Sequence, residues 1–143
     1  GRTKAYSQSK LANLLFAYEL QRKFEHNGAS IISIGAHPGY TATNLQSAGP
    51  GMKGGRRHWA WFYKITNKLL AQNVRMGVLP ILCAATDPVV EGGDYIGPRR
   101  LRGARGHPKK ARSNKCSYNE TDAKRLWQLS EELTGVVYDP LKA

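Results

Sequence analysis

The sequence predicts an α/β protein with a parallel β-sheet, and three observations lead to this fold class. A long amphipathic helix opens the chain, and a run of apolar, mostly β-branched residues follows it at 30–36. Such a run is typical of a strand that is buried on both faces of a parallel sheet. A further helix, a short strand and a last helix follow, so that helices and strands alternate as they do in α/β domains.

The first helix is expected from about Thr3 to Phe24. Its apolar residues recur with the 3.6-residue period of a helix, at Leu11, Leu14, Leu15 and Tyr18. Gly28 follows at a position where glycine often ends a helix. Because the apolar surface is broad, we expect this helix to pack against a core on one side and a partner helix on another.

The later elements are predicted from shorter patterns. A helix is expected from about Val74 to Ala85, and a short strand between glycines at 92–97. A basic loop is expected at 98–118. The C-terminal helix is expected over 119–134, where periodic apolar residues end at a glycine.

These elements do not complete a sheet. Only two strands are predicted, and a parallel sheet needs neighbouring strands and crossover connections. We therefore expect the chain to be the C-terminal half of an α/β domain whose N-terminal half carries most of the sheet.

Composition sets the outer limits of these predictions. The chain has 143 residues, of which 41% are hydrophobic, which is enough for one domain with a packed core. No apolar run is long enough to cross a bilayer. Cys83 and Cys116 lack the spacing of metal ligands or of a disulfide framework, so we expect reduced thiols in a cytoplasmic protein and no metal site.

Tyr6 and Lys10 are the first candidate site. They stand four residues apart at the start of a helix and therefore share a face. A free tyrosine has a pKa of about 10, and a nearby ammonium lowers that pKa by stabilising the phenolate. The pair can thus act in acid/base catalysis. Tyr138 and Lys142 repeat the spacing in a tail without a helix, where no such role is expected.

The loop after the strand at 30–36 is the second candidate site. Ligands of open α/β sheets bind beyond the carboxyl ends of the strands, which puts Thr41 and Thr43 on the rim of a crevice. His37 is expected to be structural. The G-x-G-x-x-G match at 49–54 does not follow a buried strand, so we interpret it as a loop and not as a phosphate cradle.

Two segments allow more than one interpretation. The aromatic cluster at 59–63 can be a substrate lid, a membrane-touching patch or part of the core. The run at 99–115 holds eight of the 22 basic residues and no acidic residue. A solvated surface explains it, and the alternative is a binding module for nucleic acid or another polyanion. Tyr118 is the only nearby aromatic, so no specific nucleic acid is expected.

Residues 6–10 (YSQSK) and 37–43 (HPGYTAT) resemble two segments of the short-chain dehydrogenase/reductase family, Tyr-x-x-x-Lys and Pro-Gly-x-x-x-Thr. Residues 125–135 resemble the tail of the branch that includes retinol dehydrogenases and protochlorophyllide-reductase-like proteins. The resemblance implies a Rossmann-like, doubly wound parallel sheet whose N-terminal, nucleotide-binding half is missing. In the family, the glycine-rich loop, the catalytic serine and the catalytic asparagine precede the tyrosine, and none of them occurs in this chain.

The resemblance also implies an NAD(P)-dependent oxidoreductase that interconverts an alcohol and a carbonyl on a fairly hydrophobic substrate. Tyr6 would donate or accept the hydroxyl proton, while Lys10 would lower the Tyr6 pKa and bind the nicotinamide ribose. The implied site for NAD or NADP consists of Tyr6, Lys10, Pro38, Gly39, Thr41 and Thr43. Residues 52–72 would form a substrate-binding lid, and the first helix would form a homodimer. These 143 residues alone are expected to be inactive.

Overall fold

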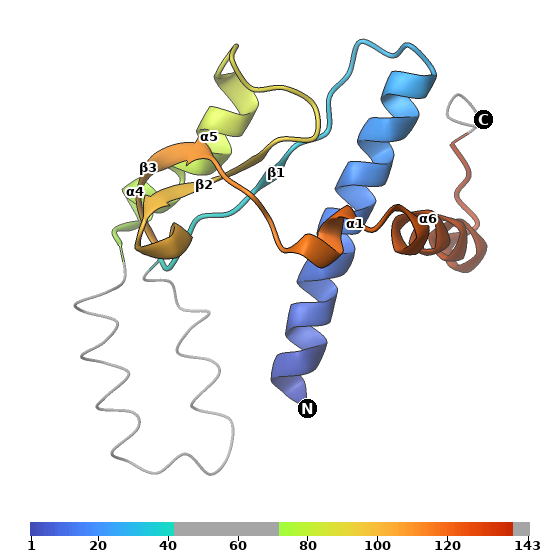
Figure 1. Ribbon diagram of the computed structural model, residues 1–143, viewed down its shortest axis with the longest axis horizontal. Coiled ribbons are helices and arrows are strands. Elements are labelled where there is room, and N and C mark those ends of the chain that lie inside the picture. The colour runs from blue at the N-terminus through green and yellow to red at the C-terminus, as the bar shows by residue number, and fades with distance from the viewer. Residues whose placement is uncertain (42–71, 139–143) are drawn as a thin grey trace. The chain divides into compact units, whose positions relative to one another are not determined.

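The computed structural model describes residues 1–41 and 72–138. Its elements follow one another along the chain as α1 (Arg2–His26), β1 (Gly35–Ala36), α4 (Val74–Gly77), α5 (Leu79–Thr86), β2 (Tyr95–Arg100), η1 (Leu101–Gly103), β3 (Arg105–Lys110), η2 (Lys115–Tyr118) and α6 (Glu120–Thr134) (Figure 1). The strands form one sheet in the order β1-β2-β3. The predicted α/β class is therefore confirmed for the described residues.

The sheet is mixed, which corrects the prediction of a purely parallel one. Gly35 N donates to Asp94 O at 2.9 Å and His37 N donates to Ile96 O at 3.0 Å, so that β1 and β2 run in the same direction. β2 and β3 form an antiparallel pair. A connection of only a few residues, η1 and Ala104, joins β2 to β3, and such a short connection permits an antiparallel pair only.

The chain divides into two compact units, and each has its own packing. Unit 1 comprises Gly1–Gly35, Val89–Tyr95 and Arg112–Ala143, and unit 2 comprises Ala36–Pro88 and Ile96–Ala111. The buried apolar side chains of unit 1 include Leu15, Tyr18, Ala123 and Trp127, and Ile96 is buried in unit 2.

In unit 1, α1 has the predicted length and the predicted end. Gly28 has a φ of 62°, a left-handed conformation that glycine adopts easily. Ala29 N donates to Phe24 O at 2.9 Å and Gly28 N donates to Glu25 O at 3.2 Å. These two bonds satisfy carbonyls that the end of a helix leaves without partners. The predicted glycine stop is confirmed.

Helix α6 is the partner helix that the apolar surface of α1 predicted (Figure 1). Trp127 is 4% exposed. Its ring stacks on Phe16 with 4.9 Å between the ring centroids. Lys23 Nζ lies 5.1 Å from the centroid of the Trp127 ring. Asn119 caps the start of α6 by accepting a hydrogen bond from Asp122 N, and Gly135 ends it, as predicted.

The predicted strand at 30–36 is wrong over most of its length. Only Gly35 and Ala36 form β1, and Ile31 and Ile32 are 60% and 52% exposed. A strand is buried on both faces only inside a sheet with neighbours and covering layers. Among the described residues β1 pairs with β2 alone.

The predicted helix at 74–85 is two helices with a break at Val78. Pro80 occupies the first turn of α5 and has no N–H, so it cannot continue the hydrogen-bond ladder of α4. Asn73 caps α4 by accepting a hydrogen bond from Arg75 N at 3.0 Å. The apolar pattern is periodic across both helices, so it does not reveal the break that the missing N–H of Pro80 causes.

The segment 98–118, expected as a basic loop, instead contains the end of β2, all of β3 and two short 3₁₀ turns. The predicted strand at 92–97 is shifted toward the C-terminus. In the β2–β3 hairpin Pro98 stands opposite Pro108, and Arg100 stands opposite Arg105. Proline is uncommon in strands and β3 has no β-branched residue, so no residue pattern predicts a strand there.

Neither cysteine is in a disulfide, since Cys83 and Cys116 are free thiols. Within 1–41 and 72–138, no helix combines the length and the apolar character that crossing a bilayer requires.

Candidate active site

The structure brings Tyr6 and Lys10 together on the N-terminal half of α1. Lys10 Nζ lies over the Tyr6 ring, 5.5 Å from its centroid. The Tyr6 side chain is 59% exposed, so its hydroxyl is available to a ligand. The shared face follows directly from the four-residue spacing on a regular helix.

A cavity of about 660 Å³ in unit 1 adjoins this pair. It is lined by the α1 face from Lys4 to Leu14, together with Tyr95, Asn114 and Cys116. Burial raises the pKa of Tyr95, which therefore stays protonated at neutral pH. The cavity thus combines a phenol and ammonium groups with apolar wall from leucine side chains and an aromatic ring, a mixture that suits a small ligand with one reactive polar group.

The loop at 38–41 belongs to unit 2, and contacts within that unit fix its conformation. Gly39 has a φ of 68°, and a Cβ there would lie 2.5 Å from Ala104 O and 2.7 Å from Pro98 Cγ. Tyr40 N donates to Ala104 O at 2.8 Å, and Thr41 Oγ1 donates to Pro38 O at 2.9 Å. Packing of the protein against itself therefore requires glycine at position 39.

His37 has the structural role that the sequence suggested. Its Nδ1 accepts a hydrogen bond from Gly39 N at 3.2 Å. Its imidazole lies against Gly97, where any Cβ would overlap the ring. Burial lowers the pKa of His37, in agreement with a neutral ring that accepts a hydrogen bond.

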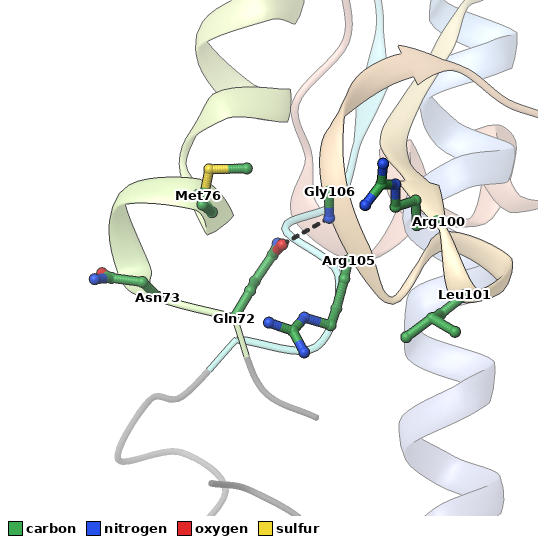
Figure 2. Close-up of a pocket in the computed structure, with 7 residues that line it drawn as sticks. All are labelled: Gln72, Asn73, Met76, Arg100, Leu101, Arg105 and Gly106. Carbon is green, nitrogen blue, oxygen red and sulfur yellow. Dashed lines mark hydrogen bonds between the residues drawn. The ribbon is translucent and has the colours of Figure 1, made fainter. Parts of the chain in front are cut away.

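Gln72 is the residue that sequence reasoning missed. Its side chain is buried and joins two separate segments. Nε2 donates to Pro38 O at 2.7 Å. Oε1 accepts from Gly106 N at 3.0 Å (Figure 2). Its backbone N donates to Tyr40 O at 2.9 Å. Both side-chain partners are 34 residues away, so no local pattern could have identified the role.

The candidate residues are divided between the two units. Tyr6 and Lys10 belong to unit 1, whereas Pro38, Gly39 and Thr41 belong to unit 2. Other predicted features lie outside the described residues: Thr43, the motif at 49–54, the aromatic cluster at 59–63, Lys142 and all of the expected lid except Gln72.

Comparison with known proteins relates the chain to dehydrogenases. It is 30% identical to human polyprenol dehydrogenase over 139 residues, which are 93% of this chain and 36% of that protein. It is 28% identical to human retinol dehydrogenase 11 over 137 residues, 94% of this chain and 37% of that one. With the short-chain dehydrogenase TIC 32 B of Brassica napus chloroplasts it shares 36% identity over 96 residues, 65% of this chain and 28% of the relative. No family model matches the chain.

A solved structure is also similar to this chain. The crystal structure of an uncharacterized protein from Mycobacterium paratuberculosis matches with a TM-score of 0.65 and 33% identity, over 92% of this chain and 39% of that one. The chain is thus a homologue of dehydrogenases over most of its length. It belongs to the short-chain dehydrogenase/reductase family. It spans about a third of the length of the curated relatives it matches.

Proposed function

We propose that the chain supplies the proton-transfer residues of an NAD(P)-dependent oxidoreductase that interconverts an alcohol and a carbonyl. The observation that carries this proposal is the Tyr6 and Lys10 pair, exposed beside a cavity of about 660 Å³. The relatives, which are named as dehydrogenases, support the same reaction class.

In this proposal Tyr6 is the acid/base. Its hydroxyl gives a proton to the carbonyl oxygen of the substrate during reduction, and takes a proton from the alcohol during oxidation. Lys10 places a positive charge over the ring, beside the point where negative charge develops as the proton leaves. Leu11, Leu14 and Tyr95 line the same cavity and would contact the apolar part of the substrate.

The donor set of this cavity fits a nicotinamide cofactor. The Lys10 ammonium and the Tyr6 hydroxyl face open space and can hydrogen-bond ribose hydroxyls. NAD or NADP, when bound, would supply or accept the hydride. From the family resemblance we propose that Pro38, Gly39 and Thr41 also contact the cofactor. Thr41 would do so through its backbone, because its hydroxyl is donated to Pro38 O. Thr43 remains a prediction from the sequence.

Replacing Tyr6 with phenylalanine tests this function, in a longer version of the chain that includes any residues encoded before Gly1. We expect the change to lower kcat by about 10²–10⁴-fold, since it removes general acid/base catalysis and little else. The assay uses NADH and NADPH with a panel of hydrophobic carbonyls and alcohols that includes retinol and a polyprenol. Tyr138→Phe is the matched control, because Tyr138 is not among the residues that line the cavity. The kcat of this variant should stay within about twofold of the parent value. Full activity of Tyr6→Phe would disprove the assignment.

The amount of chain needed for turnover is tested separately. We propose that the 143 residues work as the C-terminal part of a larger catalytic domain and are inactive alone. The support is that they span about a third of their relatives, and that the one G-x-G-x-x-G match does not follow a predicted strand. The chain and a longer version with any residues encoded before Gly1 are assayed side by side. Turnover by the short chain would contradict the proposal.

A further inference from the structure

A second cavity lies in unit 2, and none of the described residues that line it lines the cavity beside Tyr6 and Lys10. Its volume is about 790 Å³. It is lined by Gln72 and Asn73, by Met76 of α4, and by Arg100, Leu101 and Arg105 of the β2–β3 hairpin (Figure 2). None of the described residues that line it is acidic. The cavity therefore presents two guanidinium-bearing side chains beside apolar ones.

Arg100 and Arg105 are register partners, so they stand opposite each other on the two strands of the hairpin. Like charges directly opposite each other on paired strands destabilise the pair. The sequence of unit 2 holds 12 basic residues and a single acidic one, Asp87, so the charge of this unit is strongly positive. An anion between the two side chains would remove this repulsion.

The backbone beside the arginines is also unusual. The register of the hairpin shifts between Pro98 and Arg100. Leu101 and Arg102 follow with φ values of 50° and 54°, a left-handed conformation that costs free energy for residues other than glycine. Leu101 is exposed and lines the cavity. Bulges and strained residues of this kind gather at binding sites, where they redirect side chains.

A buried side chain fixes the hairpin on the other side. Gln72 Oε1 accepts a hydrogen bond from the N–H of Gly106, the residue after Arg105 (Figure 2). Gln72 Nε2 donates to Pro38 O. Because both polar atoms of this amide are satisfied by backbone groups, β3 is anchored next to Arg105 by a neutral side chain. The position of the Arg105 backbone is thus set before any ligand arrives, which lowers the entropy cost of binding.

We propose that this cavity binds a small amphipathic molecule through an anionic group, a carboxylate or a phosphate monoester. Guanidinium groups match both anions, because they can donate two parallel hydrogen bonds to each. Met76 and Leu101 contact the apolar part of the molecule. The proposal does not depend on the oxidoreductase function, since it uses neither Tyr6 nor Lys10.

Calorimetric titration of the 143-residue chain tests the ligand chemistry. The probes are decanoate, decyl phosphate, decanol and inorganic phosphate, each below its micelle concentration. We expect at least one anionic amphiphile to bind with a stoichiometry of one, and decanol and inorganic phosphate to bind at least about tenfold more weakly. The tighter of the two amphiphiles identifies the anionic group. Equal binding of decanol, or of inorganic phosphate, would overturn the proposal.

Charge-neutralising variants test the location. Arg100→Gln and Arg105→Gln should each weaken binding about tenfold, and Arg100→Lys should weaken it less. Arg99→Gln is the matched control, since Arg99 is on the same strand but does not line the cavity, and it should change binding less than about twofold. If circular dichroism shows that Arg105→Gln does not fold, the Arg100 variants alone test the location of the site. An equal loss with Arg99→Gln, or tighter and strongly salt-dependent binding of an RNA oligomer, would show a general polyanion surface and refute the proposal.

Discussion

Gly39 illustrates how a single residue controls the loop that carries the Pro-Gly pair. Its positive φ and its contact with Ala104 O leave no room for a side chain. We expect Gly39→Ala to lower the free energy of unfolding by about 3 kcal/mol, through left-handed strain and a clash with backbone. Urea unfolding followed by circular dichroism measures the loss.

Gly28→Ala separates the two causes. Gly28 also has a positive φ, 62°, but a Cβ there would meet nothing within 4 Å. The expected loss is therefore only the strain of the left-handed conformation, about 1 kcal/mol. Equal losses for the two variants would show that the contact with Ala104 contributes nothing.

His37 predicts how the stability of the chain depends on pH. Its pKa is lowered by burial in the folded protein, so that the unfolded chain binds a proton more readily. Its contribution to stability is complete above the unfolded pKa of about 6.5 and is lost as the pH falls below it toward the folded pKa. We expect the melting temperature to fall less in His37→Gln than in the parent chain between about pH 7.5 and 5.5.

An NMR titration provides the direct check on His37. The ring resonances of this histidine should report a pKa below the ordinary value for histidine. A titration at or above about 6.5 would contradict the buried, hydrogen-bond-accepting ring. The same spectra of His37→Gln assign the resonance.

Among the elements, α1 and α6 pack against each other through an aromatic contact. Trp127 is 4% exposed and stacks on Phe16. We expect Trp127→Ala to cost about 3–5 kcal/mol, because it leaves a cavity between the two helices. Leu133→Ala is the control on the same helix. Leu133 is 77% exposed and should cost no more than about 0.5 kcal/mol.

The two long helices were predictable because the signals that define them are local. Apolar periodicity placed α1 and α6, and Gly28 and Gly135 marked their ends within a residue or two. The relation of Tyr6 to Lys10 was predictable for the same reason, since helix geometry alone sets it. A helix satisfies its own backbone, so its sequence carries most of the information needed.

The strands were harder because a strand depends on its neighbours. The apolar residues at 31–32 matched a buried strand, yet they are exposed beside β1. The hairpin was missed for the opposite reason, since β3 reads RGHPKK and resembles a loop. Pairing with β2, and not propensity, makes it a strand. Gln72 belongs to the same class, because its partners come from distant segments.

On the scale of the whole molecule, charge is distributed unequally. The net charge of +12 is carried almost entirely by unit 2, with 12 basic residues and one acidic, whereas unit 1 has ten basic and nine acidic residues. Like charges so concentrated repel one another and destabilise the compact state. Six of the eight basic residues of the run at 99–115 lie in unit 2, where they are half of its 12 basic residues.

This distribution predicts that salt stabilises the chain. Raising sodium chloride from about 0.02 to 0.2 M shortens the screening length and should raise the melting temperature by roughly 2–5 °C. Sodium sulfate at equal ionic strength distinguishes screening from anion binding, because a larger rise in sulfate indicates a bound anion. A melting temperature that falls with added chloride would contradict the repulsion.

The paired prolines of the hairpin have one further consequence. β3 lies at one end of the described sheet, and the exposed edge of a sheet can recruit strands from other molecules into fibrils. Pro108 has no N–H to offer such a strand, and Lys109 and Lys110 place positive charge beside it. Pro108, Lys109 and Lys110 make β3 resemble a loop in the sequence. The same residues disfavour aggregation at this edge of the folded protein.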